Sequence, residues 1–159
     1  MEMQYALMAL FAAGIVGLDQ ITKLLVMQNI ALYSKVDVLP GLVHLTYVRN
    51  VGAAFSILQG KQWLFLLIFV LLTAVLAWEF SKKRIPFTTL ERWCLAAVWA
   101  GGLGNMIDRL RLGYVVDMIE VEFISFPVFN VADCFIPCGC ILLGVHLVFF
   151  NRKFWRETL

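Results

Sequence analysis

Four long apolar runs constrain this chain more than any other feature of its sequence. They cover residues 5–27, 63–80, 93–110 and 131–150, and each is close to the roughly 20 residues that a helix needs to cross a bilayer. Hydrophobic residues make up 62% of the 159 residues and charged residues only 15%, with a mean hydropathy of +0.85. A soluble domain is about 45–50% apolar and about 25% charged. We therefore expect an all-α membrane protein with one domain (1–159) and four transmembrane helices.

Composition also excludes several classes of protein. The net charge of +2 comes without a basic cluster on a solvated face, so no nucleic-acid partner is expected. Glu2 is the only early charge, so we interpret the first apolar run as a retained helix and not as a cleaved signal peptide. The cysteines lie within apolar runs, far in sequence from both histidines, and are expected to be small buried apolar side chains. No metal and no cofactor is expected. These residues are Cys94, Cys134, Cys138, Cys140, His44 and His146.

Two stretches between the apolar runs do not have a helical pattern. In residues 34–60, Val43, Leu45 and Tyr47 alternate with more polar positions after a Pro40-Gly41 turn. This pattern predicts a small β-hairpin or sheet outside the bilayer core, between the first and second helices. Residues 113–129 form the second non-helical stretch.

Basic residues predict the orientation of the chain. They gather between the second and third apolar runs and in the C-terminal tail, as Lys82, Lys83, Arg84, Arg92, Arg152, Lys153 and Arg156. Cytoplasmic loops of membrane proteins carry such an excess. The sequence therefore predicts that both termini are cytoplasmic and that the two non-helical stretches face outward.

This orientation brings three polar sets to the same outer level of the membrane. They are Asp19 with Lys23, then Asn105 with Asp108 and Arg109, and finally Asn130 with Asp133. Ionisable groups within membrane spans are costly and usually functional. Glycines 101, 102 and 104 precede the second set and would let the helices approach closely. We interpret this convergence as a candidate site.

Each set also has a plainer interpretation. Asp19 and Lys23 could form an interfacial ion pair, and Arg109 could extend to lipid phosphates. Asn130 followed by Asp133 resembles a helix N-cap with an acidic residue at its third position. Asp117 could be an ordinary solvated loop residue.

The side chains available for catalysis are mainly carboxylates. The chain has no Gly-x-Ser-x-Gly motif and no His-Glu-x-x-His motif, which argues against serine and zinc peptidases. Paired carboxylates that share one proton can catalyse hydrolysis without a cofactor, because one acid stays protonated while the other is ionised.

Five short motifs occur in order along nearly the whole chain. They are D-Q-I-T-K at 19–23, N-V-G-A-A-F at 50–55, G-G-L-G-N-M-I-D-R at 101–109, V-D at 116–117 and F-N-V-A-D at 129–133. With them, the chain resembles the lipoprotein signal peptidases (bacterial signal peptidase II). Met118 departs from the pattern, because the family usually has Phe there.

The resemblance implies an aspartic endopeptidase of the bacterial inner membrane with its active site near the outer leaflet. Its substrates would be prolipoproteins whose cysteine carries a diacylglyceryl group, cut just before that cysteine, and membrane lipids would surround it. Asp117 and Asp133 would be catalytic, and we expect the chain to act as a monomer. The expected supporting or substrate-binding residues are Asp19, Lys23, Asn50, Gly52, Asn105, Asp108, Arg109, Asn130 and Ala132.

Two other classes of function compete with this one. A small ion- or proton-coupled transporter would use buried acids as a relay, which predicts acids at several depths of the membrane. Here they gather at one end, and the second apolar run has no ionisable group before Glu79. A structural membrane adaptor gives no reason to put Asp19, Asp108 and Asp133 at one level. The turn around Asn50 could hold a substrate backbone or simply close the sheet.

Overall fold

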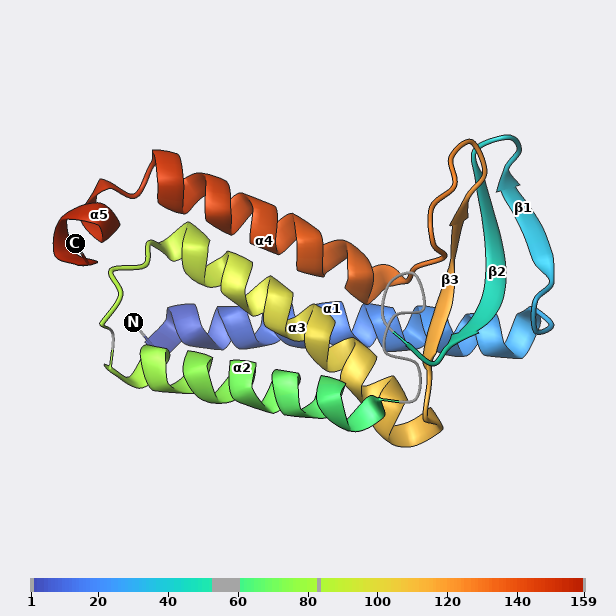
Figure 1. Ribbon diagram of the computed structural model, residues 1–159, viewed down its shortest axis with the longest axis horizontal. Coiled ribbons are helices and arrows are strands. Elements are labelled where there is room, and N and C mark those ends of the chain that lie inside the picture. The colour runs from blue at the N-terminus through green and yellow to red at the C-terminus, as the bar shows by residue number, and fades with distance from the viewer. Residues whose placement is uncertain (1, 53–60, 83, 159) are drawn as a thin grey trace.

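The computed structural model describes residues 2–52, 61–82 and 84–158. Four long helices lie side by side, α1 (Glu2–Asn29), α2 (Gln62–Lys82), α3 (Thr89–Leu112) and α4 (Val131–Phe149). A small sheet covers one end of this bundle, which we call the sheet end (Figure 1). The short helix α5 (Arg152–Thr158) lies at the opposite end, the far end, with both termini. The sequence did not predict α5.

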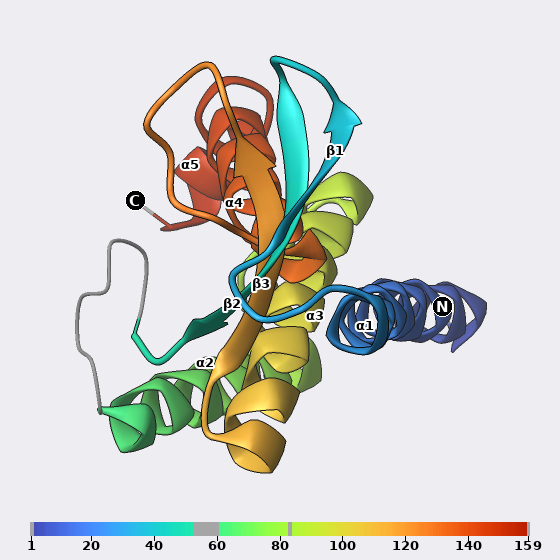
Figure 2. The same cartoon turned by 90° about the vertical axis from the view of Figure 1, so that its right-hand side faces the viewer.

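Helix α3 is the centre of the bundle. It packs against α1, α2 and α4, as the view along the bundle shows (Figure 2). A Cβ atom on Gly101 would lie 2.6 Å from the Ala132 carbonyl oxygen of α4, and one on Gly104 would lie 2.6 Å from Asp19 Oδ2 of α1. Both distances are too short for a side chain, so these glycines are what allows α3 to approach its neighbours. The predicted close approach is confirmed.

Three of the four predicted spans are confirmed as helices that can cross a membrane. Among the described residues, α1, α2 and α4 are long and apolar enough, and α3 is not. Helix α3 contains Glu91, Arg92, Asp108 and Arg109, and its small residues pack on protein. A helix surrounded by other helices needs little apolar surface of its own, which explains its lower hydropathy.

The sheet has three antiparallel strands in the order β1 (Lys35–Leu39), β2 (Val43–Asn50) and β3 (Val115–Val121). The predicted hairpin is confirmed, and Gly41 forms its turn with a φ of 76°. The prediction that the whole sheet lies between α1 and α2 is wrong, because β3 comes from the stretch between α3 and α4. Val115, Val116 and Met118 are all buried, so buried and exposed residues do not alternate along β3. Residues 53–60 of the predicted stretch lie outside the described residues.

The ends of α3 determine where β3 begins. A capping box of Thr88 and Glu91 starts the helix. Gly113 ends it with a φ of 79°, and its N–H donates to the Arg109 carbonyl. This left-handed residue lets the chain reverse at once. As a result, Asp117 stands on a strand only a few residues beyond α3, directly over the start of α4.

Candidate active site

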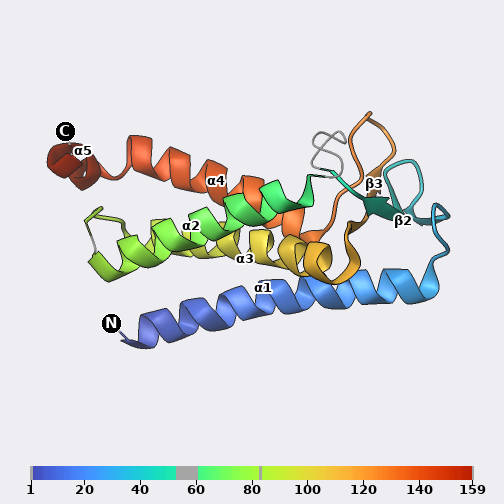
Figure 3. The ribbon, with the colours of Figure 1, turned by 60° about the horizontal axis from the view of Figure 1, so that its bottom comes forward.

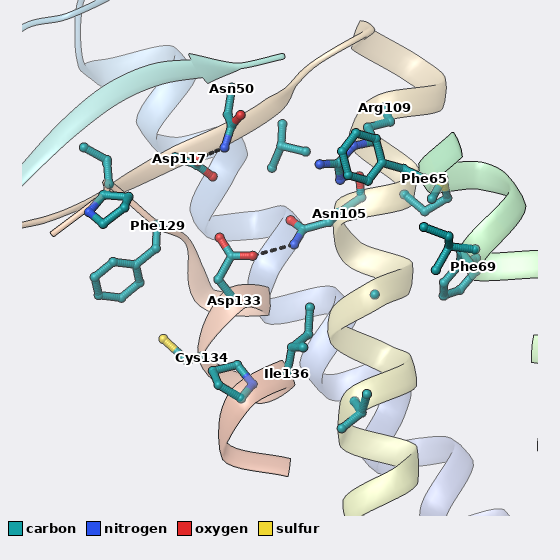
Figure 4. Close-up of a pocket in the computed structure, with 18 of the residues that line it drawn as sticks. Asn50, Phe65, Phe69, Asn105, Arg109, Asp117, Phe129, Asp133, Cys134 and Ile136 are labelled. Carbon is teal, nitrogen blue, oxygen red and sulfur yellow. Dashed lines mark hydrogen bonds between the residues drawn. The ribbon is translucent and has the colours of Figure 1, made fainter. Parts of the chain in front are cut away.

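The residues predicted for the site come together at the sheet end of the bundle. They belong to five different elements, α1, β2, α3, β3 and α4, or to the residues that flank them. Figure 4 shows Asp117 and Asp133 reaching into one cavity from opposite walls, with Asn105 beside them. The resulting set is Asp19, Lys23, Asn50, Gly52, Asn105, Asp108, Arg109, Asp117, Asn130, Ala132 and Asp133.

Asp133 lies in the first turn of α4 and closes a capping box with Asn130. The Asp133 N–H donates to Asn130 Oδ1 at 3.0 Å, and the Asn130 N–H donates to Asp133 Oδ2 at 3.2 Å. The capping interpretation is therefore confirmed. The second carboxylate oxygen, Oδ1, accepts from Asn105 Nδ2 at 2.7 Å and faces the cavity. The same side chain starts the helix and lines the site.

Asp117 is 2% exposed and lies on β3 opposite Val48, so its interpretation as a solvated loop residue is wrong. Its Oδ2 accepts from Asn50 Nδ2 at 2.8 Å, and its Oδ1 accepts from Asn130 Nδ2 at 2.7 Å. Burial and the nearby charge of Asp133 raise the pKa of Asp117 to about 7, although the hydrogen bonds from Asn50 and Asn130 lower it. An aspartate in this setting keeps a proton at a higher pH than an isolated aspartate does.

Lys23 is one of two cations in the site, with Arg109, and it bonds to the supporting residues. Its ammonium group lies 2.8 Å from Asp19 Oδ2 and 3.0 Å from Asp108 Oδ2, and all three side chains are almost fully buried. It also donates to Asn105 Oδ1 at 3.0 Å. The interpretation of Asp19 and Lys23 as an interfacial pair is wrong, because the pair is buried and shared with α3. Lys23 reaches Asp133 only through the amide of Asn105.

The two supporting acids have equivalent tasks. Asp19 Oδ1 accepts the backbone N–H of Ala132 at 3.0 Å, and Asp108 Oδ2 accepts the backbone N–H of Val116 at 3.0 Å. Ala132 immediately precedes Asp133 in the chain, and Val116 immediately precedes Asp117. Each supporting acid thus fixes the backbone one residue before a cavity-facing aspartate.

Gln20 belongs to this network, although sequence reasoning did not select it. Its Nε2 donates to Asp108 Oδ1 at 2.9 Å and to the Gly104 carbonyl at 3.1 Å. The available signal was its place in the D-Q-I-T-K motif, next to Asp19.

Arg109 stabilises the turn that follows β2. Its Nη2 donates to the Gly52 carbonyl at 2.9 Å, and its guanidinium lies 4.3 Å from the centre of the Phe65 ring. The Gly52 N–H donates to Asn50 Oδ1 at 2.9 Å. The interpretation in which Arg109 extends to lipid is therefore wrong. Residues 53–55 of the N-V-G-A-A-F motif lie outside the described residues.

A cavity of about 660 Å³ extends from these polar groups into the bundle. Its walls are apolar side chains of α2, α3 and α4, such as Phe69, Leu72 and Ile136, and Cys134 and Cys138 also line it. Only Cys94 is fully buried, while Cys138 and Cys140 are exposed, so the prediction of four buried cysteines is wrong. In the described part of the chain, no group of histidine, cysteine and acidic residues could hold a metal ion.

Comparison with known proteins gives a consistent answer. The family model described as signal peptidase (SPase) II matches residues 11–149. A lipoprotein signal peptidase from Streptococcus agalactiae serotype Ia is 45% identical over 143 residues, 90% of this chain and 88% of that protein. One from Enterococcus faecalis is 43% identical over 142 residues, 87% of this chain and 86% of that protein.

Solved structures give the same answer for the fold. A bacterial membrane enzyme superposes with a TM-score of 0.85 at 31% identity, over 93% of this chain and 91% of that chain. A second bacterial membrane enzyme has a TM-score of 0.82 at 32% identity, over 92% of this chain and 95% of that chain.

Proposed function

This chain belongs to the signal peptidase II family and has lipoprotein signal peptidase function, and we propose that Asp117 and Asp133 form its catalytic pair. The observation that carries the proposal is the shared environment of the two carboxylates. Both face one cavity, both accept hydrogen bonds from asparagine amides, and neither pairs with a cation among the described residues. Two such acids can share a single proton.

The reaction follows from that shared proton. The ionised carboxylate takes a proton from a water molecule, and the resulting hydroxide attacks the carbonyl carbon of the scissile peptide bond. The protonated carboxyl group donates a hydrogen bond to the carbonyl oxygen, which stabilises the negative charge that develops there. When the tetrahedral intermediate collapses, the peptide C–N bond breaks and the leaving amine takes the proton that the pair removed from water. Because the two acids titrate as a pair, the two tasks belong to the pair. Asn105, Asn130 and Asn50 hold both carboxylates in place for this step.

The cavity suits a lipid-linked signal peptide. A prolipoprotein with a diacylglyceryl-modified cysteine is already confined to the membrane, and its signal segment is apolar. The apolar walls can receive that segment, while the carboxylates lie at the sheet end, where water is available. The backbone around Gly52 and the side chain of Asn50 can align an extended peptide at the end of β2.

We propose that α3 is a fourth span and that the chain works as one multi-pass domain in the bacterial inner membrane. Helix α3 has 24 residues, about 36 Å of helix, and it runs beside three helices that can cross a bilayer. The basic residues of the far end support an orientation with both termini in the cytoplasm and the pair near the outer leaflet. A periplasmic reporter enzyme fused after Gly113 should then be active, and one fused after Arg152 should not. The reverse pattern would refute this topology.

The activity is tested most simply by proteolysis in detergent. The purified protein should convert a diacylglyceryl-modified precursor into a product that begins with the modified cysteine. The same precursor without its lipid should be cut far more slowly. Mass spectrometry of both products would detect cleavage elsewhere, or lipid-independent cleavage, and either result would contradict the proposed specificity.

A further inference from the structure

Helices α1 and α2 run along different sides of α3 (Figure 3), and the side chains between them line a second, separate groove. Both helices pack on α3, and at the far end they meet through the rings of Tyr5 and Phe80, whose centres are 6.1 Å apart. The groove between them has a volume of about 300 Å³. We call it the α1–α2 groove, and its lining is Tyr5, Met8, Ala9, Ala12, Thr73, Leu76, Ala77, Phe80, Leu95, Ala96 and Trp99.

The chemistry of the lining favours a hydrocarbon chain. Four of the lining residues are alanines, which make the surface concave, and most of the others are apolar. The polar atoms of its floor are satisfied within the protein, because Trp99 Nε1 donates to Thr73 Oγ1 at 3.0 Å and that hydroxyl donates to the Phe69 carbonyl at 2.8 Å. A polar ligand would find few partners here, whereas a lipid acyl chain needs none.

The far end of the groove carries one charge of each sign. A small crevice lined by Glu79 and Arg92 adjoins the groove, and both spaces share Tyr5 and Phe80 as lining residues. Glu79 is 6% exposed; its Oε1 accepts the Ile85 N–H at 2.7 Å, but its buried Oε2 has no hydrogen-bond partner among the described residues. Arg92 donates to Tyr5 Oη at 3.3 Å, and a guanidinium has further N–H groups to donate.

We propose that the α1–α2 groove binds a membrane phospholipid whose headgroup carries an ammonium group beside its phosphate. The acyl chain would lie in the groove, the phosphate would bind Arg92, and the ammonium would donate to Glu79 Oε2. The crevice has a volume of about 10 Å³, enough for one group the size of a water molecule, and a primary ammonium is of that size. Assigning this lipid to the inner leaflet rests on the topology proposed above, but the contacts themselves do not.

A bound chain would also support the wall of the active-site cavity. Trp99 forms part of the floor of the groove, and its ring stacks on Phe69, with centres 6.1 Å apart. Phe69 lines the active-site cavity and lies against Gly102. The lipid and the substrate would therefore contact opposite sides of one aromatic pair.

The test uses the purified full-length protein and native mass spectrometry. Phosphatidylethanolamine, phosphatidylglycerol and phosphatidylcholine with identical acyl chains are the probes. We expect phosphatidylethanolamine to be retained about tenfold better than the other two, because only its headgroup has a cation that donates hydrogen bonds. Equal retention of the three lipids, or a preference for phosphatidylglycerol, would overturn the proposal.

Variants locate the binding. Ala77→Phe fills the groove from its exposed rim and should abolish retention, with Ala9→Phe as a second blocking variant from α1. Ala74→Phe is the matched control, because Ala74 is also exposed on α2 but does not line the groove. Glu79→Gln should reduce the retention of phosphatidylethanolamine to that of phosphatidylglycerol.

The proposal would be overturned if both blocking variants retained as much phosphatidylethanolamine as the unsubstituted protein. It would also be overturned if the variants changed the oligomeric mass of the protein and not the amount of bound lipid. Precursor cleavage by these variants in lipid-free detergent is measured in parallel. Because Ala9 and Ala77 are remote from the carboxylate pair, cleavage should continue. A failure of the lipid proposal is thereby separated from a failure of the proposed protease mechanism.

Discussion

The two ends of the bundle both bury acidic side chains, but they use them differently. At the far end, Glu91 is 0% exposed and both of its oxygens are occupied. Its Oε2 accepts from the Thr88 N–H at 2.6 Å and from Asn151 Nδ2 at 2.7 Å, and its Oε1 lies 2.8 Å from His146 Nδ1. We call these four residues the far-end cluster. At the sheet end, Asp117 and Asp133 also accept hydrogen bonds, yet they face a large cavity.

The difference shows that burial of an acid does not by itself identify a catalytic site. The far-end cluster joins the start of α3 to the end of α4 and the residue before α5, so its hydrogen bonds stabilise the fold. At the sheet end, Lys23 pairs with Asp19 and Asp108, and the two facing acids are the residues that we propose for catalysis. The predictions below separate these two tasks.

The largest effect is expected from removing either facing acid. Asp117→Asn and Asp133→Asn should each lower the cleavage rate by about a thousandfold or more, because the pair loses its shared proton. The measurement is the initial rate on a diacylated precursor, with the melting temperature of each variant as the control for folding. Full turnover by either variant would rule out an aspartic mechanism.

A smaller loss is expected when the Asp133 carboxylate is kept but moved. Asp133→Glu retains an acid that can serve in the capping box, so its melting temperature should stay within a few degrees. The extra methylene displaces the carboxylate by about an ångström, which should cost about a hundredfold in rate. Asp108→Glu is the comparison and should retain more activity. Cleavage by Asp133→Glu at a near wild-type rate would show that Asp133 serves only to cap α4.

The far-end cluster should respond in the opposite way. Glu91→Ala leaves the donors of Thr88 and Asn151 without their acceptor and should lower the free energy of unfolding by about 1–3 kcal/mol. The rate per folded molecule should be unchanged. Glu120→Ala, which removes a partly exposed pair with Lys35, should change stability by less than about 1 kcal/mol. A large fall in the rate of folded Glu91→Ala would contradict the separation of tasks.

The smallest effect concerns pH. Activity should fall as pH rises above about 7, because the pair then loses its shared proton. The hydrogen bond from Asn50 Nδ2 lowers the pKa of Asp117. Asn50→Ala should therefore move the fall of activity at high pH, the basic limb of the pH profile, to a higher pH. Normalised profiles of kcat/KM against pH measure the shift. A basic limb that stays in place, or moves to lower pH, would mean that another group controls it.

The sequence predicted which residues come together at the sheet end, because they stand in periodic, recognisable positions. Asp19 and Lys23 are one helical turn apart, and so are Asn105 and Arg109, so each pair shares a helix face. Basic residues fixed the relative orientation of the helices, and that orientation brought the polar sets to one level. The capping box at Asn130 was also visible as a local pattern.

What the sequence did not predict depends on contacts between distant residues or on unusual burial. His146 lies 55 positions from Glu91, and no local pattern joins them. Strand β3 is buried on both faces, so it lacks the alternation by which β2 was recognised. The lower hydropathy of α3 has its cause in packing, since its neighbours and not lipid surround its small residues.

One paired measurement tests the central claim most directly, by comparing Asp117→Asn with Glu91→Gln at pH 8. Each change replaces a buried carboxylate by an amide of the same shape, and both the cleavage rate and the melting temperature are recorded. Because the pKa of Asp117 is raised in the folded protein, the stability that it contributes is lost as pH rises from about 4 to about 7. At pH 8, Asp117→Asn removes a buried charge but also loses one of the two hydrogen bonds from Asn50 and Asn130. We therefore predict that Asp117→Asn is inactive but folded, with a smaller fall in melting temperature than Glu91→Gln, and that Glu91→Gln is active. An active Asp117→Asn, or an inactive Glu91→Gln that remains folded, would contradict the account.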